Sequence, residues 1–407
     1  MVIGVEAVNA YVGRAVVGVA EMFADRGLNT ARFDNLMMEQ KSVCLPCEDP
    51  VSNAVNAARP LLAALGADQV EAIELLVVGT ESGLDFGKPI STYIHSQLGL
   101  SRRCRSFEVK HACYGGTAAL RTAAGILAAD PAAPAARALV IATDAPATDA
   151  HGTYWEPSEG TGAVAMLIGP DPAVLALDPG ASGFHTYEVM DTARPAVDDE
   201  VVDSDLSLLA YLQCLEASYA AYCDRVAGVD LRTTFDHLVF HTPFAGMVKG
   251  AHRTLARRRG GLSGAEVEQD FQARVADSLR YARRVGNLFS AALYLALCSL
   301  LDHGEFERPK RLGLFSYGSG CASEFFSGVV PAGVTPPGIQ AALDDRYPLT
   351  VPEYDKLTAD GAARGFGTKD AVFDPAGYGA VYRSHFEGRG LLVLDRIRGY
   401  HREYRWT

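Results

Sequence analysis

The sequence predicts an α/β protein in which strands and helices alternate along the chain and stack in layers. Short apolar runs at 73–79, 138–143 and 160–169 have the length and composition of strands that are buried on both faces. Segments rich in Ala and Leu with helical spacing separate these runs, and such β-α-β alternation is typical of helices packed on a sheet. The 407 residues are enough for two domains or for one double-sized α/β unit.

Composition and charge restrict the partners and the compartment. The formal net charge of -12 disfavours nucleic acid and anionic membrane surfaces, because the long-range field repels phosphate. The N-terminus has no charged segment followed by an apolar one, so we expect no signal peptide and a cytoplasmic location. The longest apolar run, 288–301, is shorter than the roughly 20 residues of a membrane helix. It predicts a buried core helix, and we expect no membrane association.

The cysteines indicate a reduced protein without a bound metal. The 8 cysteines are scattered through a long chain, unlike the disulfide framework of a small secreted domain. Cys44 and Cys47 have the CxxC spacing of redox or zinc sites, but no second pair of Cys or His is spaced to complete a metal tetrad. We therefore interpret this pair as structural.

In the first half of the chain, a polar loop follows a predicted buried strand. Helical patterns at 16–23 and 54–65 precede the apolar run 73–79, and Glu81 comes directly after that run. Active-site loops leave the strand ends of open α/β sheets, so Glu81 is placed for chemistry. The alternative is an ordinary solvated carboxylate, which most isolated loop glutamates are.

Cys113 lies where an extended run ends and a helix begins. Two glycines follow it, and an Ala-rich helical pattern starts at about Thr117. A helix N-terminus favours an anion and lowers the pKa of a thiol, so this position predicts a nucleophilic thiolate. A buried, inert cysteine is the alternative, and the local pattern alone leaves both open.

The prolines at 170 and 172 suggest a boundary, so we predict two halves, 1–170 and 171–407. In the second half a helical pattern at 205–226 precedes a short strand at 238–240, which leads directly into His241. Pro243 is suited to the first turn of a helix, so His241 occupies a strand-to-helix junction like that of Cys113. A lone histidine is more often structural than catalytic, and only its context favours a role.

The helix after His241 carries Lys249, Arg253 and Arg257 at intervals of four residues. This spacing puts them on one face of the helix. They form either an ordinary solvated face or a site for a phosphate or an acidic partner, which is notable in an acidic chain. A second basic cluster, at 102–105, precedes the Cys113 segment.

Polar residues also adjoin two later apolar segments. Asn287 comes just before the apolar run 288–301, and its amide must find a hydrogen-bond partner there, in the protein or in a ligand. The segment 311–321 runs from a strand into a glycine-rich turn that contains Ser316 and Ser319. Small residues let such a turn approach a ligand and present N–H groups to an oxyanion. The tail after about residue 345 indicates no mechanism.

Together these segments resemble the hydroxymethylglutaryl-CoA synthases of the thiolase superfamily. The motifs that carry the resemblance are TES at 80–82, KHACYGGTA at 110–118, FHTPF at 240–244, GNLFSA at 286–291 and SYGSG at 316–320. Further segments are similar to the polyketide branch of the family, the hydroxymethylglutaryl-ACP synthases of β-branching. They are TARFDNLM at 30–37, the segment 47–60, FEVKH at 107–111, EPS at 156–158 and DTARP at 191–195.

The resemblance implies a five-layer αβαβα fold of two duplicated halves, a homodimer, and catalysis by Cys113, Glu81 and His241. Cys113 would hold an acetyl or propionyl group as a thioester, and Glu81 would remove a proton from it. The resulting carbon would add to the β-ketone of a second acyl thioester. A protonated His241 would then donate a proton to the alkoxide, and water would hydrolyse the bond to Cys113.

The resemblance also implies the surrounding contacts. Backbone N–H groups of Cys113 and Ser319 would form an oxyanion hole, Asn287 would orient the second substrate, and Tyr114 and Ser316 would lie beside them. No metal or redox cofactor is implied. Both acyl groups would arrive on the phosphopantetheine arms of acidic carrier proteins, one a dedicated donor and one the acceptor of a polyketide synthase.

The basic groups are candidates for contact with those carriers. We expect Lys249 to be the strongest candidate, with Arg253, Arg257 and the cluster at 102–105 as further docking residues. The alternatives are a hydroxymethylglutaryl-CoA synthase of primary metabolism that uses acetyl-CoA and acetoacetyl-CoA, and a ketosynthase III type of enzyme, which needs no general base such as Glu81. A non-catalytic scaffold that binds carrier proteins is the alternative of a different class.

Overall fold

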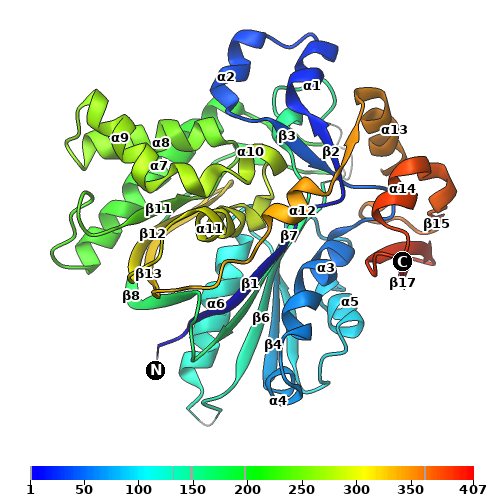
Figure 1. Cartoon of the computed structure of the whole chain (residues 1–407), viewed down its shortest axis with the longest axis horizontal. Helices are drawn as coiled ribbons and strands as arrows, with labels where there is room; N and C mark the ends of the chain where they lie inside the picture. Colours follow the sequence, from blue (N-terminus) through cyan, green and yellow to red (C-terminus); the bar gives the residue numbers. More distant parts are fainter. Residues whose placement is uncertain (1, 132, 147–149, 197–198, 362–363) are drawn as a thin grey trace.

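A computed structural model describes residues 2–131, 133–146, 150–196, 199–361 and 364–407. Its centre is one mixed sheet with the strand order β11-β12-β13-β8-β1-β7-β6-β4-β5 (Figure 1). The strands are β1 (Gly4–Tyr11), β4 (Ile73–Gly79), β5 (Arg105–Val109), β6 (Arg137–Asp144), β7 (Gly162–Gly169), β8 (Leu175–Thr186), β11 (His237–Phe240), β12 (Lys310–Gly318) and β13 (Ala322–Val330).

The sheet repeats one pairing pattern in its two halves. In the first, β4 is parallel to β6, and β6, β7 and β1 follow as antiparallel neighbours. In the second, β11 is parallel to β12, and β12, β13 and β8 follow in the same way. Only Gly4 and Val5 of β1 pair with β8, so the halves meet over a short seam. The boundary near residue 170 falls between β7 and β8, and independent domains stay a prediction.

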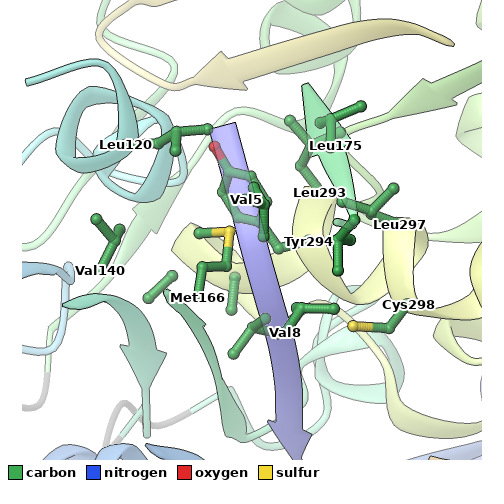
Figure 2. Packing of buried hydrophobic residues seen from close by; sticks show 14 of the residues in the cluster. Val5, Val8, Leu120, Val140, Met166, Leu175, Leu293, Tyr294, Leu297 and Cys298 are labelled. Carbon is green, nitrogen blue, oxygen red and sulfur yellow. The ribbon is translucent and has the colours of Figure 1, made fainter. Parts of the chain in front are cut away.

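Helices complete five layers. The helices α6 (Gly115–Ala129) and α11 (Ala292–His303) lie between the two half-sheets, and their apolar residues share one buried cluster with both (Figure 2). The helices α3 (Pro50–Ala63) and α5 (Ile90–Gln97) cover the outer face of the first half-sheet, and α7 (Ser204–Arg225) and α8 (Ala245–Arg258) that of the second. Each half-sheet is thus covered on both faces, as its apolar strands require.

The helix α11 explains the long apolar run of the sequence. Every residue from Ala292 to Leu301 is buried, because half-sheets surround this helix rather than solvent. The predicted core helix is therefore confirmed, although a short 3₁₀ turn, Phe289–Ala291, precedes it. Among the described residues no helix is long and apolar enough to cross a membrane.

Two N-terminal segments differ from the sequence prediction. The central strand β1 was not predicted, because Glu6 interrupts its apolar run. Glu6 lies at a register shift between Val5 and Ala7, where Arg137 binds its carboxylate at 2.7 Å. The segment 16–23, predicted as a helix, is a strand, β2 (Ala15–Gly18), followed by α1 (Val19–Asp25). Its valines pair with β3 (Gln40–Val43), and pairing outweighs helical spacing there.

The C-terminal tail folds back onto the first half. Arg402 forms a buried ion pair with Asp49 at the start of α3, and Asn56 of α3 hydrogen-bonds the backbone of Leu392. The tail contains β14 (Tyr347–Leu349), α13 (Val351–Gly361), β15 (Ala371–Val372), α14 (Gly379–His385), β16 (Leu392–Arg398) and β17 (His401–Trp406). The remaining elements are α2 (Phe33–Leu36), α4 (Ala67–Glu71), β9 (Thr192–Ala193), β10 (Val201–Val202), α9 (Gly264–Arg274), α10 (Ala282–Val285) and α12 (Gln340–Asp344).

Candidate active site

The predicted site residues occupy equivalent places in the two halves. Glu81 follows β4 and His241 follows β11, which are corresponding strands. Cys113 precedes α6 and Asn287 precedes α11, the two central helices. Because the C-terminal ends of parallel strands lie at one edge of a sheet, residues far apart in the sequence gather near the N-termini of these helices.

Glycines allow the backbone to close around Cys113. A Cβ on Gly79, at the end of β4, would lie 2.5 Å from the carbonyl carbon of Gly115. A Cβ on Gly318, at the end of β12, would lie 2.6 Å from the backbone nitrogen of Tyr114. Neither position has room for a side chain, so glycine brings the ends of both strands against the Cys113 turn. Ala112, just before Cys113, has a φ of 39°, a left-handed conformation that costs an alanine free energy.

Asp144 ties the Glu81 turn to the segment that follows Asn287. Its Oδ1 accepts hydrogen bonds from the backbone N–H of Glu81 at 2.9 Å and of Ser82 at 3.0 Å. The hydroxyls of Thr80 and Ser82 donate to the same oxygen. Its Oδ2 accepts a hydrogen bond from the backbone N–H of Ser290 at 3.0 Å. This fully buried carboxylate therefore fixes both sides of the site.

Cys113 and Glu81 lie side by side, with Sγ 4.0 Å from Oε1. Burial raises the pKa of the Cys113 thiol well above its usual value, and the charges of Glu81 and Asp144 raise it further. This direction opposes the expected thiolate, which rested on the helix N-terminus. The Cys113 thiol lies within hydrogen-bonding reach of the Glu81 carboxyl group.

Glu81 has the properties of a base that is poised near neutral pH. Burial raises the pKa of its carboxyl to about 8 against the opposing charge of Arg194, and Asp144, Glu200 and Glu159 raise it as well. An ionised Glu81 can accept a proton from a neighbouring carbon or sulfur atom. With a pKa near 8 its conjugate acid can also return that proton.

His241 is buried, and its imidazole is neutral. Burial lowers the pKa of His241 to about 3, which acts against the protonated form that the expected role as general acid requires. Its Nδ1 has no hydrogen-bond partner among the described residues. The backbone of His241 is held by Phe315 and Tyr211, through bonds of 2.7 Å each. A neutral imidazole in this setting can donate one hydrogen bond through its N–H and accept one at its other nitrogen, but it is a weak acid at neutral pH.

Asn287 faces Cys113 from the second half. Its Oδ1 accepts a hydrogen bond from the backbone N–H of Phe289 at 2.8 Å, which fixes the orientation of the amide. A hydrogen bond between the Asn287 side chain and Cys113 acts to lower the pKa of the thiol. The backbone of Asn287 also pairs with that of Glu159. The amide NH₂ group is thus directed at the sulfur and at whatever is bound to it.

The remaining predicted binding residues have different surroundings. The Tyr114 hydroxyl donates to Glu324 at 2.9 Å, and the Ser316 hydroxyl accepts from Thr117 at 2.7 Å inside the protein. Both side chains therefore support the turn rather than offer a free polar group. Ser319 is partly exposed in the turn after β12, next to Gly318, which touches Tyr114. The backbone of this turn is thus brought to the Cys113 loop.

The predicted docking residues do not all lie near the site. Lys249 is paired with Glu268 at 3.0 Å, whereas Arg253 and Arg257 are exposed and have no ion pair among the described residues. All three lie on α8, which begins four residues after His241. The cluster at 102–105 ends at the first residue of β5, whose 5 residues span about 16 Å and end near Cys113. That cluster therefore lies at the end of β5 that is remote from Cys113. This position argues against a role in docking at the site.

The CxxC pair has structural surroundings. Cys44 lies 2.6 Å from the Thr161 hydroxyl, and Cys47 is in the buried apolar cluster of the first half. All eight cysteines are free thiols. Within the described part of the chain, no group of three or more His, Cys, Asp or Glu side chains could hold a metal ion.

Three charged residues of the site were not predicted. Arg194 forms ion pairs with Glu81 at 3.7 Å and with Glu200 at 3.0 Å, and Asp144 holds the Glu81 turn. Arg194 belongs to the segment 191–195, which was noted only for its resemblance to relatives. Asp144 ends the buried strand β6, so the rule that placed Glu81 after β4 could also have found it. Glu200 carried no signal of its own.

Comparisons with known proteins agree with this geometry. Residues 2–173 match the hydroxymethylglutaryl-coenzyme A synthase N-terminal family model, and residues 175–258 and 262–354 match the C-terminal one. The polyketide biosynthesis 3-hydroxy-3-methylglutaryl-ACP synthase PksG of Bacillus subtilis is 48% identical over 99% of both chains. The hydroxymethylglutaryl-CoA synthase of Enterococcus faecalis is 34% identical over 88% of this chain and 92% of its own.

A solved structure gives the same result. The hydroxymethylglutaryl synthase of the curacin biosynthetic pathway, in complex with acetyl donor-ACP, superposes with a TM-score of 0.96 at 46% identity over 100% of both chains. The fold is thus the thiolase-like fold of acyltransferases that condense thioesters. The chain belongs to the hydroxymethylglutaryl-CoA synthase family. The predicted family, fold, enzyme class and similarity to the polyketide enzymes are therefore confirmed.

Proposed function

We propose that this protein transfers an acetyl or propionyl group from a donor acyl carrier protein to Cys113 and condenses it with the β-ketone of a carrier-bound polyketide intermediate. The observation that carries the proposal is Glu81 beside Cys113, at 4.0 Å, with a pKa near 8. A base at that distance reaches the methyl group of an acetyl thioester on the sulfur. The relatives named for carrier-bound substrates have the higher identities to this chain.

The first step is acylation of Cys113. Its sulfur attacks the carbonyl carbon of the donor thioester, the bond to the pantetheine sulfur breaks, and the pantetheine thiol leaves with the proton of Cys113. Glu81 is an acidic group 4.0 Å from the sulfur, so in its ionised form it can accept that proton and pass it to the leaving thiol. The negative charge that develops on the carbonyl oxygen is stabilised by backbone N–H groups of Cys113 and of the adjoining Ser319 turn.

The second step forms the new carbon–carbon bond. Ionised Glu81 removes a methyl proton from acetyl-Cys113, and the resulting enolate carbon adds to the β-ketone of the acceptor. The amide of Asn287 orients the acceptor. The neutral imidazole of His241 contributes a hydrogen bond to the ketone oxygen rather than a proton, because its pKa is about 3. The alkoxide then takes its proton from Glu81, which has just become protonated.

The last step is hydrolysis. Water attacks the thioester carbonyl, the bond to Cys113 breaks, and the former acetyl group leaves as a carboxylate on the acceptor chain. No residue needs to change its oxidation state. The groups that this reaction requires are the thiol, the carboxylate and hydrogen-bond donors, and phosphopantetheine enters only as the carrier of both substrates.

Mass spectrometry of the intact protein tests the donor. We expect an acetyl mass gain after incubation with acetyl-loaded carrier protein and little gain with acetyl-CoA at the same concentration. Efficient gain from acetyl-CoA, followed by condensation with acetoacetyl-CoA, would instead support the primary-metabolism synthase. No gain from either donor would contradict the proposed donor chemistry.

Charge reversal on α8 tests docking. We expect the double variant Lys249→Glu, Arg253→Glu to raise the KM for the carrier protein about tenfold and to leave kcat nearly unchanged, because acidic carriers lose an attractive face. The effect should shrink at high salt. The matched control, Arg102→Glu with Arg103→Glu, reverses two charges at the opposite end of β5 and should leave KM unchanged. Equal KM values for wild type and the α8 variant would exclude this docking face.

We further propose a cytoplasmic homodimer. The strand β5 forms the edge of the central sheet beside β4, and it adjoins the Cys113 turn. An edge strand offers unpaired backbone groups to a second strand, so two copies could pair there. The molar mass in solution, from light scattering, distinguishes a dimer from a monomer.

A further inference from the structure

One cation lies in a cluster of carboxylates next to Cys113. The Nη2 of Arg194 is 3.7 Å from Oε1 of Glu81 and 3.0 Å from Oε1 of Glu200. Its Nε donates to the same Glu200 oxygen at 3.1 Å, and the guanidinium lies over the ring of Phe289 at 5.3 Å. Arg194 is therefore held by two contacts to Glu200, and the Nη2 that makes one of them also lies near the predicted base.

The segment that carries Arg194 is anchored to the other side of the site. The buried carboxylate of Asp191, three residues earlier, accepts hydrogen bonds from the Tyr317 hydroxyl at 2.8 Å and from the backbone N–H of Gly320 at 3.0 Å. The backbone N–H of Asp203 donates to the Asp191 carbonyl at 2.9 Å. Arg194 thus extends from a segment fixed to the Ser319 turn and contacts Glu81 across the site.

We propose that Arg194, held by Glu200, is a positioning residue that orients the Glu81 carboxyl group toward Cys113 and favours its ionised form, which acts as the general base. This inference rests on the proposed role of Glu81. A fixed cation on one carboxylate oxygen limits the rotation of that side chain and stabilises its charged form. Arg194 is the cation among the charged groups that act most strongly on Glu81, and the others are the carboxylates of Asp144, Glu200 and Glu159.

The groups around Glu81 define the sign of the effect. Burial and the carboxylates of Asp144, Glu200 and Glu159 raise the pKa of Glu81, and Arg194 is the charge that lowers it. Glu159 interacts with Glu200 and with Lys41, and the charge of Lys41 lowers the pKa of Glu159. Loss of Arg194 therefore raises the pKa of Glu81 above about 8, and loss of Glu200 lowers it.

Exchange of methyl protons on acetyl-Cys113 in D₂O measures this effect directly. The rate, followed by peptide mass spectrometry across a pH series, should rise with pH as Glu81 ionises. For Arg194→Met we expect the midpoint to move up by about one pH unit and the rate near neutral pH to fall about tenfold. Exchange should recover at alkaline pH. Arg194→Lys keeps a charge and should stay within about threefold of wild type.

Further variants separate positioning from damage to the fold. Glu200→Gln should move the midpoint down, opposite to Arg194→Met, and a general loss of structure cannot produce opposite shifts. Arg311→Met removes a guanidinium paired with Asp178 near the far end of β12, about 25 Å from the site, and should leave the profile unchanged. If wild type exchanges but Arg194→Met keeps the wild-type midpoint, the role of Arg194 is wrong. If the wild-type protein is acetylated but its methyl protons do not exchange, the proposed role of Glu81 as the base is wrong.

Discussion

Replacement of Cys113 by alanine should abolish the mass gain from acetyl-loaded carrier protein, with condensation falling below detection. The sulfur is the atom that forms the thioester, and an alanine methyl group cannot replace it. Fold and carrier binding should persist, because Cys113 is partly exposed and its neighbours are held by the backbone contacts of Gly79 and Gly318. Intact-protein mass spectrometry and carrier titration measure the two properties separately.

The matched control is Cys223→Ala. Cys223 is also a partly exposed free thiol, but it lies on α7, on the outer face of the second half. This variant should acquire one acetyl group at the wild-type rate. An acetyl group that remains on Cys113→Ala would show that another residue is the acceptor.

Replacement of Glu81 by glutamine should separate acylation from condensation. Removal of the charge beside Cys113 lowers the pKa of the thiol, because that charge is one of the causes that raise it. We therefore expect Glu81→Gln to be acetylated fully on longer incubation. Condensation and methyl-proton exchange should fall about 100- to 10,000-fold, the range for loss of a general base.

The pH dependence gives a second measure of the same residue. A base acts in its ionised form, so a pKa of about 8 predicts that wild-type exchange increases through neutral pH and levels off above about 8. Glu81→Gln should lose this increase and retain only the slow exchange caused by hydroxide. His241 should add no inflection near its usual pKa, because burial keeps it neutral.

Glu74→Gln is the control for both measurements. Glu74 lies on β4, the strand that Glu81 follows, but it is exposed near the other end of that strand. It should leave acylation, exchange and condensation unchanged. Condensation by Glu81→Gln at nearly the rate of wild type would contradict the assignment of Glu81 as the base.

The sequence by itself determined the layered fold and the identities of the central side chains. The strands β4, β6 and β7 and the helix α11 consist mostly of apolar residues, so the sequence itself indicates that they are buried. Glu81 adjoins β4, Cys113 precedes α6, and His241 follows the buried strand β11. Their motifs therefore indicated both their chemistry and their positions at strand or helix ends.

Other features followed from contacts between distant segments. The strand β1 contains Glu6, and only Arg137, far along the chain, explains how that charge is accommodated inside a sheet. The segment 16–23 has a helical pattern but pairs in part with β3. Pairing and ion pairs of this kind depend on which segments meet, so no local pattern reports them.

The protonation states were decided by the tertiary structure alone. A thiolate at Cys113 and an imidazolium at His241 are reasonable expectations from residue type and from a helix N-terminus, but burial acts against both charged forms. Desolvation acts on charged forms in proportion to how completely the whole fold excludes water. Likewise, the pKa of Glu81 depends on burial and on charges that come from separate segments of the chain. Those charges belong to Arg194, Asp144 and Glu200, which lie together only in the folded protein.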